Sequence, residues 1–257
     1  MSVPLYDYQQ DAVDRLKNGS ILCGGVGSGK SRTSLAYYHK VARTKDLYII
    51  TTARKRDTKE WEDEVKPFNL KRKVTIDSWN NIGKYRDIVD AFFIFDEQRV
   101  VGYGAWVKSF LKITRVNEWI LLSATPGDTW QDYIPVFIAN GFYRNKTEFA
   151  REHIIYSRFS KYPKIDRYVN EGKLLRLRRQ ILVTMDFKRK TVSHHEDVYV
   201  SYNIPLYKDV TRSRWDPYKN EPIPDASGLC YVWRKIVNTS EARQLALLEI
   251  FEKHPKL

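Results

Sequence analysis

A glycine-rich segment ending in a lysine and a serine is the first pattern in the sequence that could do chemistry. The run GGVGSGKS at residues 24–31 matches G-x-x-x-x-G-K-[ST], and it follows an apolar run and precedes a helix-like stretch, as this pattern requires. Glycines let the backbone curl so that successive N–H groups converge on phosphate oxygens, and the start of a helix adds a favourable field. The sequence therefore predicts a nucleotide-phosphate site in which Lys30 binds the β- and γ-phosphates and Ser31 binds Mg²⁺. The residues expected to contact the nucleotide here are Gly25, Gly27, Ser28, Gly29, Lys30, Ser31 and Arg32.

Two acidic residues, Asp96 and Glu97, follow the apolar run at residues 92–95. Taken alone, such a pair is typical of an exposed strand end. Together with the phosphate loop it predicts catalysis: Asp96 would hold the Mg²⁺ shell, and Glu97 would orient and deprotonate an attacking water. We therefore expect Lys30, Asp96 and Glu97 to be the catalytic residues.

A third polar segment, SATP at residues 123–126, follows the apolar run at residues 120–122. Its two hydroxyl residues, Ser123 and Thr125, would lie beside the phosphate site. In isolation the segment is typical of a capped turn before a helix. In the presence of the other motifs, both residues are candidates for sensing loss of the γ-phosphate and coupling it to a second ligand.

The positioning of these motifs depends on alternating strands and helices. Short apolar runs at residues 21–23, 47–50, 92–95 and 120–122 predict buried strands, and residues 32–41, 58–65 and 105–113 between them predict helices. This alternation predicts an α/β fold with a parallel sheet that is covered by helices on both faces. Ligands of such sheets bind at the carboxyl ends of the strands. We expect this domain to span residues 1–150.

The remaining residues, 151–257, predict a basic extension built from helices and strands. The pattern predicts helices over residues 146–159 and 173–182, a strand over 197–202, a loop over 215–225 and a closing helix over 240–253, capped by Ser240.

Charge suggests a polyanionic partner. The chain has 44 Lys and Arg against 31 Asp and Glu, a formal net charge of +13, and residues 144–190 alone have fourteen basic and five acidic residues. In this stretch Arg176, Arg178 and Arg179 share a predicted helix, and tyrosine and phenylalanine residues are interleaved with the basic ones. The pattern favours sequence-independent contacts with a nucleic-acid backbone. A solvated basic face is the alternative.

Cysteine usage and hydropathy indicate the class of protein and its cellular location. Cys23 and Cys230 are far apart and have no metal-ligand spacing, so neither a disulfide framework nor a zinc site is expected. No apolar run approaches the ~18 to 20 residues that span a bilayer. We expect a cytoplasmic protein with no membrane partner.

The order of the motifs resembles the first lobe of superfamily 2 helicases, and the Swi/Snf-type branch fits best. The resemblance is carried by Tyr8-Gln9, GGVGSGKS, TTAR at 51–54, DEQR at 96–99 and SATP at 123–126, with Trp61-Glu62 and residues 198–207 in addition. Residues 123–149 and 153–165 are also similar to short DEAD/DEAH-type helicases encoded by bacteriophages, which would place the protein in a host cytoplasm. The resemblance implies a RecA-like P-loop NTPase fold.

The resemblance also implies roles for individual residues. Gln9 would read the adenine of ATP, and Thr52, Arg54 and Trp79 would touch a nucleic-acid backbone. For Trp79 a role in the core remains an open alternative. The implied cofactors are ATP and Mg²⁺, and the implied partner is DNA, expected to be duplex and bound without regard to sequence.

One motif of the family is missing. No arginine motif of the QxxGRxxR kind occurs, since LLRLRRQ at residues 174–180 has neither the glycine nor the spacing. Residues 247–257 resemble the helix that leads into the family's second lobe. We expect a first lobe with its connector, which binds ATP but is nearly inactive until a second RecA-like lobe joins it in cis or in trans. The alternative is an ATP-gated DNA-binding or adaptor module without motor activity.

Overall fold

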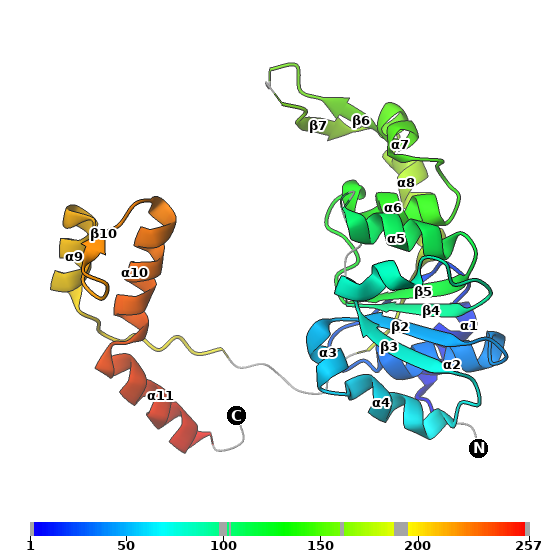
Figure 1. Ribbon diagram of the computed structural model, residues 1–257, viewed down its shortest axis with the longest axis horizontal. Coiled ribbons are helices and arrows are strands. Elements are labelled where there is room, and N and C mark those ends of the chain that lie inside the picture. The colour runs from blue at the N-terminus through cyan, green and yellow to red at the C-terminus, as the bar shows by residue number, and fades with distance from the viewer. Residues whose placement is uncertain (1–2, 98–101, 103, 160–161, 188–194, 255–257) are drawn as a thin grey trace. The chain divides into compact units, whose positions relative to one another are not determined.

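The chain forms two compact units, residues 1–188 and residues 189–257. The computed structural model describes residues 3–97, 102, 104–159, 162–187 and 195–254 (Figure 1). The elements of the first unit are α1 (Asp7–Arg15), β1 (Ile21–Cys23), α2 (Lys30–Val41), β2 (Leu47–Thr51), α3 (Ala53–Asp57), α4 (Glu60–Val65), η1 (Lys66–Phe68), β3 (Val74–Ser78), η2 (Trp79–Tyr85), β4 (Phe92–Asp96), α5 (Ala105–Thr114), β5 (Glu118–Ser123), α6 (Trp130–Ala139), α7 (Lys146–His153), β6 (Ile154–Tyr156), β7 (Ile165–Tyr168), α8 (Glu171–Ile181) and β8 (Leu182–Thr184).

A six-stranded sheet in the order β3-β2-β4-β5-β1-β8 forms the centre of the first unit, and every neighbouring pair in it is parallel. The four strands that the apolar runs predict are β1, β2, β4 and β5. The structure adds β3 and β8 at the two edges. The predicted fold class, a RecA-like parallel α/β sheet with helices on both faces, is confirmed.

Alternation along the strands divides the core between the two faces of the sheet. Phe92 and Ile94 of β4 pack in one cluster with Leu35 of α2, whereas Phe93 and Phe95 pack on the opposite face with helix α5. Helices α1, α2 and α4 cover the first face, and α5, α6 and η2 cover the second (Figure 1). Because both faces are covered, the strands are continuous apolar runs, and this is why the sequence shows them so clearly.

The first unit extends beyond the boundary predicted at residue 150. After α7, strands β6 and β7 pair antiparallel, and α8 then leads into β8, which pairs with β1. Leu174 and Ile181 of α8 are buried in the same cluster as Phe93 and Phe95. The chain therefore divides at 188 and not at 150, because residues 171–184 complete the sheet and its core. The helix predicted over 146–159 ends at His153, where β6 begins.

The second unit is a small helical body. Its elements are α9 (Ile204–Ser213), β9 (Trp215–Asp216), β10 (Glu221–Pro222), α10 (Ala226–Asn238) and α11 (Glu241–Lys253). Its core is formed by Val210, Ile223, Leu229, Val232 and Ile236.

Three details of this unit differ from the sequence-based expectation. The strand predicted over 197–202 is wrong, because residues 195–203 have no regular secondary structure. The predicted loop over 215–225 contains the two short strands β9 and β10. Ser240 does precede α11, but its hydroxyl makes no capping hydrogen bond. Within the described residues, no helix is both long and apolar enough to cross a membrane.

Candidate functional site

The predicted motifs meet at the carboxyl-terminal edge of the sheet, where parallel strands all end. The phosphate loop follows β1, Asp96 and Glu97 end β4, and Ser123 ends β5. Together they surround a cavity of about 630 Å³. Its lining residues are Val26, Gly27, Gly29, Lys30, Ser31, Lys55, Glu60, Glu64, Asp96, Glu97, Ser123, Ala124 and Thr125.

The course of the phosphate loop requires glycine. Gly27 and Gly29 have φ angles of 80° and 77°, which side chains rarely tolerate. A Cβ added to Gly29 would also collide with the Gln9 amide, and one at Gly24 would collide with the Ser28 hydroxyl. The loop therefore presents bare backbone to the cavity just before α2 begins at Lys30. Such a loop at a helix N-terminus fits phosphate groups.

Helix α1 supports the phosphate loop through hydrogen bonds. The Gln9 amide nitrogen donates to the Ser28 carbonyl at 3.3 Å, and the Tyr8 hydroxyl donates to the same oxygen at 3.2 Å. The Gln9 amide oxygen accepts from the Tyr6 N–H at 3.0 Å. Gln9 and Ser28 are both buried. Gln9 thus supports the loop and does not line the cavity, and adenine recognition by this residue stays a prediction.

Lys30 and Ser31 begin α2 at the mouth of the cavity. The Lys30 ammonium donates to the Gly24 and Gly25 carbonyls at 2.7 and 3.0 Å. Burial lowers the pKa of this ammonium, although Asp96 partly offsets the effect. Arg32, the next predicted nucleotide contact, lies 3.7 Å from the Glu64 carboxylate. It lines a smaller cavity of about 340 Å³ beside α4 and is not part of the main one.

Asp96 is held by residues from three other elements. Its side chain is buried, and Oδ2 accepts hydrogen bonds from the Thr51 hydroxyl at 2.9 Å, the Trp61 indole at 3.0 Å and the Lys55 ammonium at 3.1 Å. Among the described residues no hydrogen bond reaches Oδ1. These described contacts fix the Asp96 carboxylate through Oδ2.

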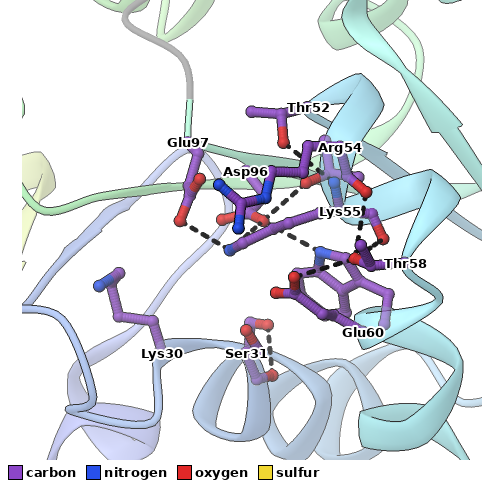
Figure 2. A network of polar contacts seen from close by, with 12 residues as sticks. Lys30, Ser31, Thr52, Arg54, Lys55, Thr58, Glu60, Asp96 and Glu97 are labelled. Atoms are coloured by element: carbon purple, nitrogen blue, oxygen red, sulfur yellow. Dashed lines mark hydrogen bonds and ion pairs between the residues drawn. The ribbon is translucent and has the colours of Figure 1, made fainter. Parts of the chain in front are cut away.

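Lys55 links the two acidic residues, as Figure 2 shows. Its ammonium lies 2.7 Å from Glu97 Oε1, and Glu97 has a left-handed φ angle of 58°. Burial lowers the pKa of Lys55, but the carboxylates of Asp96 and Glu97 outweigh it and hold the pKa above its usual value. Lys55 is thus a charged member of the site.

Lys55 was not predicted from the sequence, and Thr51 was named only as the first residue of the TTAR motif. One signal was available: both lie where β2 ends and α3 begins, and β2 pairs with β4. Residues that follow neighbouring parallel strands meet at the same edge, so a cation after β2 can reach the acids after β4.

Ser123 and Thr125 connect β5 to the phosphate loop. The Ser123 hydroxyl accepts from the Thr125 N–H at 3.1 Å, and the Ser123 carbonyl accepts from the Gly24 N–H at 3.4 Å. Both residues line the cavity. Ser123 thus contacts the phosphate loop through a backbone hydrogen bond, and the coupling role of both residues stays a prediction.

The three predicted nucleic-acid residues of the first lobe have different environments. Thr52 caps α3, where its hydroxyl accepts from the Lys55 N–H at 3.3 Å, and the Arg54 side chain is exposed. Trp79 is 3% exposed, and its indole donates to the Asp96 carbonyl at 2.9 Å. Trp79 therefore packs in the core, which favours the core role over stacking on a base, and its contact with a nucleic acid stays a prediction.

The predicted basic helix is α8, outside the cavity. Arg176 and Arg179 are exposed on it, whereas Arg178 is half-buried with its guanidinium 5.5 Å from the centre of the Trp130 ring. Arg176 and Arg179 are therefore the more exposed of these three arginines. Arg99 of the DEQR motif lies outside the described residues.

Comparison with known proteins gives a partial likeness to a solved structure. No protein-family model matches the sequence, and no curated protein matches it. Among solved structures, the chain is similar to the crystal structure of the Pyrococcus furiosus Hef helicase domain, with a TM-score of 0.40 and 16% sequence identity. The aligned part covers 58% of this chain and 40% of that chain.

Proposed function

We propose that this chain is the ATP-binding lobe of an ATP-dependent nucleic-acid motor of the superfamily 2 helicase kind. One observation carries the proposal: a glycine-built phosphate loop, a buried aspartate with a neighbouring glutamate, and a hydroxyl pair line a single cavity at the carboxyl edge of a parallel sheet. Each group alone is common. Their convergence on one cavity is what an ATPase site needs.

The residues present fit Mg-ATP. The glycine-built loop leads into the start of α2, where a helix N-terminus favours phosphate, and Lys30 supplies a positive charge for the phosphates. Ser31 and Asp96 provide the oxygen ligands that Mg²⁺ prefers, directly or through water. When bound, the metal ion neutralises charge on the phosphates. Glu97 is the carboxylate in position to orient and accept a proton from water.

We assign contacts with DNA to the carboxyl-terminal edge of the sheet and to helix α8. Arg54 is exposed one residue from Lys55, next to the cavity, and Arg176 and Arg179 present further positive charge. Guanidinium groups bind phosphate oxygens without reading base sequence. We therefore propose sequence-independent binding of duplex DNA, and a second RecA-like lobe as the partner that completes the motor.

Binding of a fluorescent ATP analogue, mant-ATP, tests the proposal. The full chain should bind it with Mg²⁺, and Lys30→Ala should weaken binding by about tenfold or more, equivalent to about 1.4 kcal/mol. Lys66→Ala is the matched control, because Lys66, the first residue of η1, is exposed and is paired with Asp63 of α4. Absence of binding by the wild-type chain, or equal binding by Lys30→Ala, would contradict the proposed function.

A further inference from the structure

Lys55 occupies the position between the two acidic residues of the site. It lies in the first turn of α3, and its side chain is 20% exposed. The ammonium contacts Asp96 Oδ2 at 3.1 Å and Glu97 Oε1 at 2.7 Å (Figure 2). Two carboxylates at neighbouring positions repel each other, and a cation that contacts both offsets this repulsion.

The other lysine of the site does not serve this purpose. Lys30 donates to two loop carbonyls, and within the described part of the chain Lys55 is the sole cation in contact with Asp96 or Glu97. Lys55 also lines the main cavity together with Ser31. Lys55 thus supplies the positive charge that balances the two carboxylates, a role that a bound metal ion would otherwise take.

A divalent cation and an ammonium group compete for the same carboxylates. Mg²⁺ that approached Asp96 from the cavity would meet the charge of Lys55, and like charges at this range repel strongly in a partly buried site. Lys55 has a flexible four-carbon stem and a compact charge, so it can withdraw while α3 stays in place. Its withdrawal would also release the Glu97 carboxylate, which is paired as long as Lys55 remains.

We propose that Lys55 is a positioning residue that acts as an internal counter-ion: it holds Asp96 and Glu97 in the nucleotide-free site and is displaced from them when Mg²⁺ enters with the nucleotide. The inference rests on the proposed ATP-binding function. It assigns to a residue of α3 a role in metal entry and in releasing Glu97 for its part in the reaction.

The test measures the Mg²⁺ requirement of mant-ATP binding by the full chain. Lys55→Met keeps the apolar stem and removes the charge, so half-maximal binding should need roughly tenfold less Mg²⁺ than in the wild type. Lys55→Arg keeps the charge and can bridge both carboxylates with its planar fork, so it should need more Mg²⁺. Lys112→Met is the control, because it removes an exposed lysine paired with Asp87 on the α5 side.

The possible outcomes distinguish failure of the counter-ion role from failure of the proposed ATP-binding function. An unchanged or increased Mg²⁺ requirement in Lys55→Met overturns the counter-ion role, since a lysine that only binds phosphate would weaken nucleotide binding when removed. If Lys55→Met does not fold, Lys55→Arg provides the test. A Lys55→Arg variant that needs no more Mg²⁺ than the wild type overturns the counter-ion role. If the wild-type chain binds no mant-ATP at any Mg²⁺ concentration, the proposed function fails and the inference fails with it.

Discussion

Replacement of Trp61 by phenylalanine tests how Asp96 is held. Trp61 is fully buried on α4, and its indole N–H donates to Asp96 Oδ2 at 3.0 Å. Trp61→Phe removes this donor and part of the ring. A hydrogen bond to a charged group contributes about 1.5–3 kcal/mol, and shrinking a buried ring costs roughly 1–2 kcal/mol more. The expected loss is therefore about 2.5–5 kcal/mol of the free energy of unfolding of the first unit.

Trp119→Phe is the matched control. Trp119 is equally buried and packs edge-on against Phe110 with ring centres 5.1 Å apart, and none of the hydrogen bonds among the described residues joins its indole N–H to a carboxylate. This substitution removes the same atoms without breaking a bond to a carboxylate, so about 1–2 kcal/mol is expected. The difference between the two variants isolates the bond to Asp96.

Urea denaturation followed by far-ultraviolet circular dichroism gives the two free energies without relying on tryptophan fluorescence. At about 2–4 °C per kcal/mol for a unit of this size, thermal melting should separate the variants by about 3–12 °C. Equal destabilisation of Trp61→Phe and Trp119→Phe would show that the indole N–H of Trp61 does not hold the Asp96 carboxylate, and the account of a carboxylate fixed through one oxygen would be refuted.

Three further predictions concern pH, DNA and turnover. Burial raises the pKa of Asp77, but four hydrogen-bond donors outweigh it and lower the pKa below 3.8. The stability that Asp77 adds is thus present above pH 3.8 and is lost as the pH falls through the pKa of Asp77 in the folded state. The urea midpoints of the wild type and of Asp77→Asn should therefore converge in acid. A difference between the two midpoints that stays constant with pH would contradict this. Exchange of Arg176 and Arg179 for alanine should reduce the salt dependence of DNA binding by about 1.8 in log–log slope, which Lys66→Ala should leave unchanged. Because an arginine finger contributes about 10³ to 10⁵ in rate and no QxxGRxxR motif occurs in these residues, DNA-stimulated ATP turnover by this chain should stay below about 1 s⁻¹; faster turnover that Glu97→Gln abolishes would count against it.

The buried helix–sheet arrangement could be predicted because its signals are local. Strands covered on both faces must be continuous apolar runs, and residues 47–50 and 92–95 show this directly. Strand β3 was missed because four of its five residues are only half-buried, and β8 was missed because it directly follows α8, so the helix predicted over 173–182 included its first residue. The boundary at 188 depends on β8 pairing with β1, which no local composition indicates.

The sequence by itself determined the phosphate loop, because its chemistry depends on contiguous residues: glycines that accept positive φ angles and a lysine and serine at the first turn of a helix. It also placed Asp96 and Glu97 at a strand end. Only the tertiary structure decided which groups surround Asp96. Thr51, Lys55 and Trp61 are 35 to 45 residues away in the chain. They reach one carboxylate because β2 lies beside β4 in the sheet, and a strand order of this kind is set by packing of the whole unit and not by any short pattern.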